Sequence, residues 1–85
     1  MYKIIFTKQA YKSLRRIPQE IVGRIRDRLD RIAEDPYAQN PNVTKLQNRA
    51  GYRLRAGDWR VIYDVQEGEL VILVLKVDSR GDIYR

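Results

Sequence analysis

An alternation of apolar and polar residues, broken in the middle by glycine and aspartate, constrains the fold of this chain more than any other feature. Between residues 52 and 65, apolar or aromatic side chains occupy every second position on both sides of Gly57 and Asp58. A period of two is typical of a strand with one buried face, and two such runs joined by two turn-forming residues predict a β-hairpin. Gly57 readily takes the positive φ that a two-residue loop requires, and Asp58 is among the residues that tolerate it in the next position.

The two-residue loop also predicts the register of the hairpin. Counting outward from the loop pairs Ala56 with Trp59, Arg55 with Arg60, Leu54 with Val61, Arg53 with Ile62, and Tyr52 with Tyr63. One face of the hairpin is then apolar, whereas the other face carries the guanidinium groups of Arg53, Arg55 and Arg60.

These three arginines indicate a binding surface for phosphate. Like charges on directly opposed hairpin residues repel by up to about 1 kcal/mol, and arginine cannot lose its proton to relieve the repulsion. A phosphate would replace the repulsion with attraction, because the planar guanidinium group matches phosphate oxygens. The alternative is a solvated basic edge that only keeps the protein soluble.

The length and the charge of the chain limit its class. Its 85 residues are expected to form one domain, residues 1–85, with a thin core. Lys and Arg total 17 against 11 Asp and Glu, and the net charge of +6 favours nucleic acid or an acidic protein as a partner. The chain has no cysteine, no signal sequence at its start and no apolar run long enough for a membrane span. We therefore expect a cytoplasmic protein that does not contact membranes.

A strand and two helices are predicted before the hairpin. Residues 2–6 alternate like a strand, and Thr7 is placed to cap a helix over residues 8–17. The inward face of this helix is expected to contain Ala10, Leu14 and Ile17, with Tyr11 beside them. Pro18 interrupts the helical pattern, and a second helix then begins at Pro18 or Gln19.

The second helix has a clear apolar stripe and ends where Asp35 precedes Pro36. Apolar residues recur at spacings of four, four and three, at Ile21, Ile25, Leu29 and Ile32. The opposite face alternates charges and is expected to be solvated, and it comprises Arg24, Asp27, Arg28, Arg31 and Asp35.

Residues 70–75 are apolar at every position, as in a central strand that is covered on both faces. The two helices supply one cover, and a partner is expected to supply the other. The predicted order is therefore β-α-α-β-β-β. This order indicates the α+β class, with two N-terminal helices packed on one face of a small, largely antiparallel sheet.

Composition excludes several kinds of active site. The chain has no histidine and no cysteine, so it lacks a Cys/His zinc site, a thiol nucleophile and an imidazole base. Asp78 and Asp82 are a weak metal signal, and we expect neither a metal nor a cofactor. What remains is a basic and aromatic set, typical of single-stranded RNA recognition, made of Lys45, Arg49, Arg53, Arg55, Arg60, Arg80 and Tyr84. The alternative for Tyr84 is a terminal ring packed on the sheet edge.

The run YRLRAGDWRVIYDV, followed by a strand and VDSRGDIYR, strongly resembles the RelE/ParE superfamily of bacterial and archaeal toxins. Within it, the chain is most similar to the RelE-like mRNA interferases. The resemblance covers essentially the whole chain and implies a RelE-like microbial RNase fold. It also implies a toxin of a type II toxin–antitoxin system that cleaves mRNA in the ribosomal A site. In such enzymes the ribose 2′-hydroxyl attacks the adjacent phosphodiester.

The resemblance assigns roles to several residues. The basic strand positions of the family fall on Arg53 and Arg55, its next-strand arginine on Arg60, and its tail residues on Arg80 and Tyr84. Catalytic roles are thus expected for Arg55, Arg60, Arg80 and Tyr84, and RNA or phosphate binding for Lys45, Arg49 and Arg53. Well-known members have lysine at the two strand positions and others have a histidine, whereas arginine stays protonated. The general base is therefore open between Tyr84, Lys45, Asp78 and a ribosomal group.

The resemblance also implies partners. These are the 70S ribosome with its mRNA, and a cognate antitoxin that covers the sheet and the basic groove and links the complex to operator DNA. Two alternatives share the fold. One is a ParE-like toxin that inhibits DNA gyrase without nuclease activity, and the other is an inactive relative kept as a repressor partner. The tail residues Arg80 and Tyr84 favour the nuclease.

Overall fold

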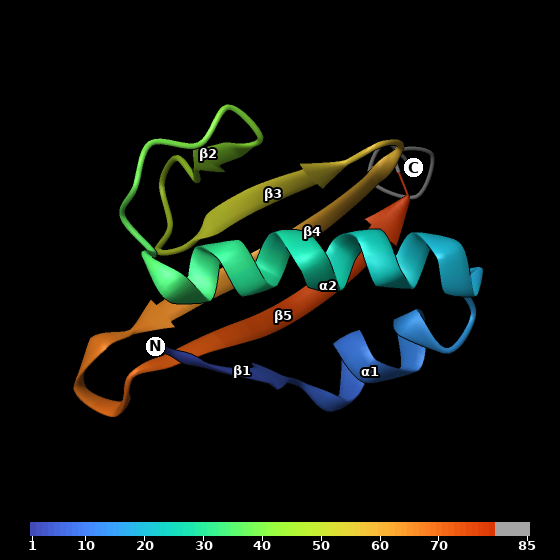
Figure 1. Ribbon diagram of the computed structural model, residues 1–85, viewed down its shortest axis with the longest axis horizontal. Helices are drawn as coiled ribbons and strands as arrows, with labels where there is room; N and C mark the ends of the chain where they lie inside the picture. The colour runs from blue at the N-terminus through green and yellow to red at the C-terminus, as the bar shows by residue number, and fades with distance from the viewer. Residues whose placement is uncertain (80–85) are drawn as a thin grey trace.

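The computed structural model describes residues 1–79, which form one five-stranded sheet and two α-helices (Figure 1). The elements along the chain are β1 (Lys3–Phe6), α1 (Lys8–Leu14), α2 (Gln19–Glu34), β2 (Val43–Lys45), β3 (Tyr52–Ala56), β4 (Trp59–Gln66), a 3₁₀ turn η1 (Glu67–Glu69) and β5 (Val71–Ser79). The strands are ordered β1-β5-β4-β3-β2, with β1 parallel to β5 and the other pairs antiparallel. The predicted α+β class is confirmed, and the short edge strand β2 is added to it.

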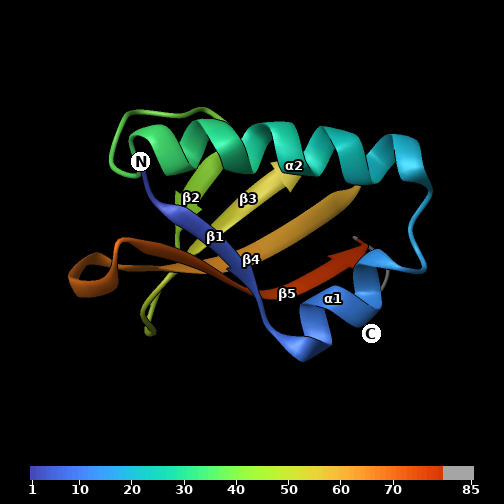
Figure 2. The same cartoon turned by 60° about the horizontal axis from the view of Figure 1, so that its bottom comes forward.

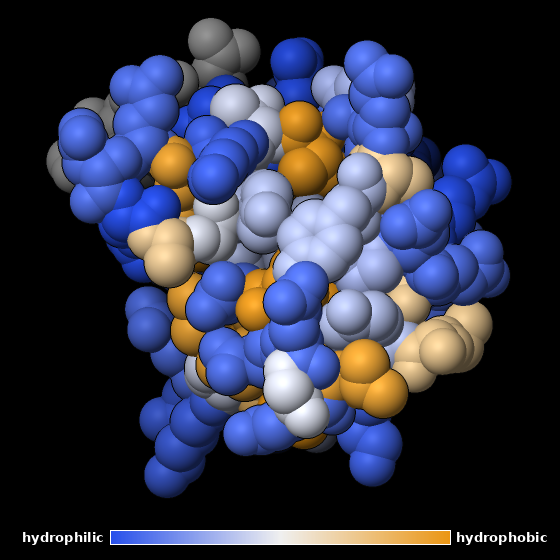
Figure 3. Space-filling view, turned by 90° about the vertical axis from the view of Figure 1, so that its left-hand side faces the viewer, coloured by the Kyte–Doolittle hydropathy of each residue, from blue (hydrophilic) through white to orange (hydrophobic). Residues whose placement is uncertain are grey.

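The two helices occupy different places on the sheet. Figure 2 shows α2 lying across one face, while α1 follows β1 at the edge beside the second half of β5. The end of the molecule formed by the α2–β2 loop and the β4–β5 turn has a mostly hydrophilic surface with scattered hydrophobic areas (Figure 3). Within residues 1–79, neither helix is long and apolar enough to cross a membrane.

Thr7 fixes both the start of α1 and its position beside the sheet. The Thr7 hydroxyl accepts a hydrogen bond from the Ala10 amide at 3.1 Å and donates one to the Leu75 carbonyl of β5 at 2.9 Å. Ala10 and Ile17 are buried as predicted, but Tyr11 is 58% exposed, so its predicted place beside the inward face is wrong. α1 contacts the sheet along a narrow face, and a residue about 100° around the helix axis from Ala10 reaches solvent.

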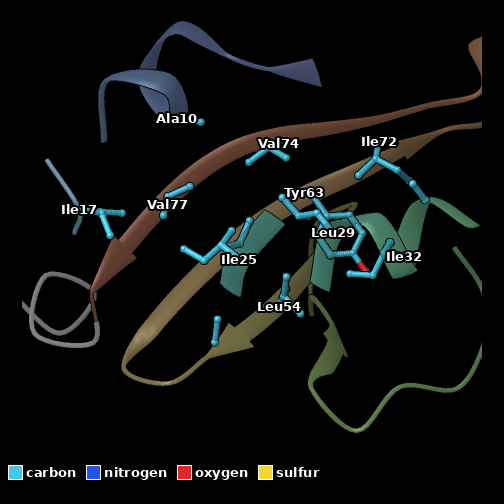
Figure 4. Close-up of a cluster of buried hydrophobic side chains, with 13 residues drawn as sticks. Ala10, Ile17, Ile25, Leu29, Ile32, Leu54, Tyr63, Ile72, Val74 and Val77 are labelled. Atoms are coloured by element: carbon cyan, nitrogen blue, oxygen red, sulfur yellow. The ribbon is translucent and has the colours of Figure 1, made fainter. Parts of the chain in front are cut away.

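α2 supplies the main apolar cover of the sheet. The predicted stripe is confirmed at Ile25, Leu29 and Ile32, which are buried, whereas Ile21 in the first turn is half-buried. These side chains belong to one core cluster with the buried sheet residues Leu54, Ala56, Val61, Tyr63, Ile72, Val74 and Val77 (Figure 4). The core therefore lies between α2 and the centre of the sheet.

A β-bulge interrupts the pairing of β4 with β5. The register shifts between Ile62 and Tyr63, which leaves Leu75 of β5 without a partner on β4. Val74 and Val77 both face the core although they are three positions apart, and strict alternation along a strand does not allow this. The extra residue restores the buried face of β5 beyond the bulge.

The face of the sheet away from α2 carries an uncovered apolar strip, defined as Ile5, Ile62, Leu73 and Leu75. Ile5 of β1 lies directly opposite Leu73 of β5, and both alternate with residues that pack in the core. Ile5 is 41% exposed, and all four side chains lie outside the core cluster. The described elements therefore leave part of the sheet with apolar surface in reach of a partner, as the sequence predicts.

Candidate nucleic-acid interface

The β3–β4 hairpin has the predicted register. Arg55 lies directly opposite Arg60, and Arg53 lies opposite Ile62. Residues that are directly opposed share a face of the sheet, and Leu54 between the two β3 arginines is fully buried. The hairpin arginines, Arg53, Arg55 and Arg60, therefore project together from the face that α2 does not cover.

The loop of the hairpin differs from expectation in one detail. Gly57 has a φ of 63°, whereas Asp58 is not among the described residues with positive φ. Positive φ at the first loop position alone is the type II′ pattern. Glycine is thus required at position 57 as predicted, but Asp58 does not adopt the left-handed conformation expected of it.

Arg60 lies between a cation and an anion. Its neighbour on β3 is Arg55, which is exposed, and its neighbour on β5 is Asp78. The Asp78 carboxylate forms an ion pair with Lys76 at 3.1 Å, and both side chains share the face of the hairpin arginines. This face holds more positive than negative charge, with one carboxylate in register with Arg60.

Arg28 of α2 holds the backbone of Arg55. Its Nη1 donates a hydrogen bond of 2.6 Å to the Arg55 carbonyl, while the Arg55 amide donates to the Asn42 carbonyl at 2.8 Å. Arg28 is half-buried, so its predicted place on the solvated face of the helix is wrong. Its position one residue before the fully buried Leu29 puts it at the border of the apolar stripe, and from there it reaches β3.

Lys45 projects from the other face of the sheet. On β2 it lies opposite Tyr52, whose ring stacks on the buried Tyr63 with centroids 5.4 Å apart. The structure therefore does not bring Lys45 together with the hairpin arginines. Thr44, which lies opposite Arg53, is the β2 residue that shares the face of the hairpin arginines.

Arg49 lies in the loop between β2 and β3, at the far end of β3 from Arg55. Since β3 has 5 residues, its length is about 17 Å. The loop is closed by a hydrogen bond from the Leu46 amide to the Gly51 carbonyl at 3.0 Å. Gly51 has a φ of 114°, and a Cβ there would lie 2.9 Å from the Tyr63 carbonyl, so this close approach requires glycine.

The tail residues of the predicted site, Arg80 and Tyr84, lie outside the described residues, as does Asp82. The last described residue, Ser79, lies opposite Trp59 at the end of β5. Within residues 1–79, no group of three acidic residues is arranged to hold a metal ion.

Tyr63 is excluded as a proton acceptor. Its side chain is fully buried, and burial raises the pKa of Tyr63 to about 12, with a further contribution from Tyr52. The hydroxyl has no hydrogen-bond partner among the described residues. At neutral pH Tyr63 is therefore an uncharged core residue.

The interface is suited to binding phosphate and to stabilising negative charge. Three guanidinium groups supply many N–H donors that never lose their charge, and the register of the hairpin places all three side chains on one face. Donors fixed in advance stabilise charge that develops during a reaction. Asp78 is the carboxylate that the register places beside them.

A family model described as the ParE toxin of the type II toxin–antitoxin system parDE matches residues 4–84. The chain belongs to this toxin family. Toxin RelG of Mycobacterium tuberculosis is 30% identical to it over 88 residues, which cover 99% of this chain and 97% of RelG. The range that the family model matches, residues 4–84, contains every residue of the predicted site.

Solved structures have the same fold as this ParE-family toxin. The archaeal RelE–RelB complex from Pyrococcus horikoshii matches with a TM-score of 0.78 and 33% identity over 94% of this chain and 96% of that chain. The intact Escherichia coli RelBE complex matches with a TM-score of 0.78 and 24% identity over 93% of this chain and 96% of that chain, a likeness of fold. The chain is thus a RelE/ParE superfamily toxin with a RelE-like fold.

Proposed function

We propose that this toxin is a ribosome-dependent mRNA endonuclease that cleaves in the ribosomal A site and so inhibits translation. The observation that carries the proposal is the pairing of Arg55 with Arg60 on an uncovered sheet face. Two opposed guanidinium groups favour an anion between them, and mRNA supplies phosphates at regular spacing. The 33% identity to an archaeal RelE supports RelE-like chemistry.

In this mechanism the ribose 2′-hydroxyl attacks the adjacent phosphorus and gives its proton to a base. The bond to the 5′-oxygen then breaks, and this oxygen takes a proton from water, which leaves a 2′,3′-cyclic phosphate and a 5′-hydroxyl. Arg60 and Arg80 neutralise the charge of the phosphorane-like transition state. Arg53 and Arg55 hold the flanking phosphates, and Tyr84 stacks on a base so that the attack is in line.

The proton acceptor comes from a smaller set than the sequence alone leaves open. Lys45 projects from the opposite face of the sheet, which removes it from the reacting atoms in this proposal. Asp78, in register with Arg60, stays in the set together with Tyr84 and a group of the ribosome. Arg49, at the other end of β3, contacts a phosphate further along the mRNA.

A cognate antitoxin is part of the proposal. The matched Pyrococcus horikoshii RelE is in a complex with RelB, which supports a partner of this kind. The antitoxin would cover the apolar strip, whose exposure is otherwise unfavourable, and mask the hairpin arginines beside it. The resulting complex would bind operator DNA through the antitoxin.

Primer extension on an mRNA that is being translated in a cell extract tests the nuclease. Added toxin is expected to produce cuts within codons, and these cuts should vanish when ribosomes are left out. Arg60→Ala should lower single-turnover cleavage by about 10²- to 10³-fold, the effect of losing one preorganised charge donor. Folded Arg60→Ala protein that cleaves at the wild-type rate would show that Arg60 has no catalytic role.

Inhibition of DNA gyrase is the second candidate function, because the matching family model is that of the ParE toxin. A supercoiling assay with purified gyrase separates the two candidates. Loss of supercoiling without any mRNA cleavage would favour gyrase, and cleavage with normal supercoiling would favour the nuclease.

A further inference from the structure

α1 and the turn after it carry a cationic surface that the proposed mechanism does not use. Lys8, Lys12, Arg15 and Arg16 are all exposed, and residues 1–19 contain no acidic residue. Within residues 1–79, none of the four forms an ion pair with a carboxylate. Lys8 and Lys12 are four residues apart on α1, and Arg15 and Arg16 follow at its C-terminal end. Lys12 and Arg16 line two shared hollows, one with Lys8 and one with Arg15, so the four charges add.

An exposed aromatic ring lies among these cations. Tyr11 is 58% exposed, three residues after Lys8 and four before Arg15, at the spacings that bring side chains together on a helix. Core packing therefore does not account for this tyrosine. A ring that stacks on a base, flanked by cations that contact phosphates, is typical of surfaces that bind single-stranded RNA.

The α1 surface adjoins the hairpin arginines. Arg16 lines a hollow of about 200 Å³ together with Trp59 and Asp78, and Asp78 lies opposite Arg60. α1 and the β3–β4 turn lie at the same end of the molecule (Figures 1 and 2). The ion pair with Lys76 offsets the charge of Asp78 between the two cationic surfaces.

We propose that α1 is an accessory site for single-stranded RNA outside the cleavage site. Tyr11 stacks on a base, and Lys8, Lys12, Arg15 and Arg16 contact the backbone phosphates. The identity of this RNA as mRNA rests on the proposed function. Because a short RNA fills only the hairpin surface, the contribution of α1 to affinity grows with the length of the strand.

Fluorescence anisotropy with labelled single-stranded RNAs of about 4 and about 12 nucleotides tests the proposal. Tyr11→Ala should weaken binding of the longer RNA about tenfold, the loss of one stacked base, and leave binding of the shorter RNA within about twofold. Tyr11→Phe keeps the ring and should restore the binding of the longer RNA. For the longer RNA, the logarithm of the binding constant falls linearly with the logarithm of the salt concentration, and Lys12→Gln should make this slope shallower by about 0.7.

Matched controls come from the opposite end of the molecule. Tyr37 is 55% exposed in the α2–β2 loop, and Arg31 is an exposed cation of α2. Tyr37→Ala and Arg31→Gln should leave the binding of both RNAs unchanged.

Equal losses from Tyr11→Ala and Tyr37→Ala, or an equal loss for both RNA lengths, would overturn the accessory site. A further control measures the binding of duplex RNA and of polyglutamate. If either binds as tightly as the longer single-stranded RNA and is equally sensitive to Lys12→Gln, the surface recognises any polyanion and the accessory site is overturned. The length effect is measured without ribosomes. It can therefore hold even where ribosome-dependent cleavage is absent, which separates failure of this inference from failure of the proposed function.

Discussion

Among single residues, Arg28 links the α-helical layer to the interface. Arg28→Ala leaves the Arg55 carbonyl without its 2.6 Å donor, and this should cost about 1 kcal/mol of stability. Loss of this hydrogen bond should also make β3 more mobile at Arg55. We therefore expect the variant to cleave mRNA about tenfold more slowly when ribosomes are saturating. Arg31→Ala, one turn along α2 and exposed, is the control. Equal cleavage rates in the two variants, measured in single turnover, would show that the bond does not position Arg55.

The buried hydroxyl of Tyr63 should make the stability of the fold sensitive to alkaline pH. Its folded pKa of about 12 lies above the ordinary value of 10.0, so its contribution to stability is complete below pH 10 and is lost as the pH rises through 12. Tyr63→Phe keeps the ring and removes the titration. The wild type should lose about 1.4 kcal/mol relative to this variant between pH 7 and pH 11. At pH 7 the variant should be at least as stable, because the hydroxyl has no partner among the described residues. Urea unfolding at both pH values measures the difference, and parallel changes would contradict it.

Among the elements, α2 covers most of the core. Leu29→Ala should cost about 2 to 5 kcal/mol, because Leu29 is fully buried and a cavity remains. Asp30→Ala, at the next and exposed position, should change stability by less than about 0.5 kcal/mol. Urea denaturation of both variants gives the comparison. Similar losses would mean that the packing of α2 does not depend on this stripe.

The elements also show which parts of the fold local sequence determines. The hairpin register was predictable because Gly57 fixes a two-residue loop, and the loop fixes every pair that follows. β2 was not predictable, because three residues after a loop rich in proline and asparagine give no periodicity. The face of Lys45 depends on the register between β2 and β3, and no tight turn sets that register. The bulge at Leu75 depends on how β5 pairs with β4 while it packs against the core, which is a tertiary effect.

At the scale of the whole molecule, the interface combines elements that are distant in the sequence. The hairpin supplies Arg53, Arg55 and Arg60 by a local rule, and their shared face was predicted correctly. The contact from Arg28 comes from α2 and required the packed structure to be seen. The roles of Arg80 and Tyr84 stay predictions, because both lie outside the described residues. The fold was therefore more predictable than the contacts around the site. The spacing of apolar residues along the sequence determines the fold, whereas the contacts around the site join residues that are distant in the sequence.

The position of β5 has a consequence for the synthesis of the toxin. β5 lies between β1 and β4 in the sheet, yet it is the last described strand to leave a ribosome. Neither β1 nor the hairpin can complete its pairing until β5 emerges, so a nascent chain has no finished sheet on which to display the arginines. The sheet that displays the hairpin arginines is therefore completed only after β5 has emerged, although β1 and the hairpin are made earlier.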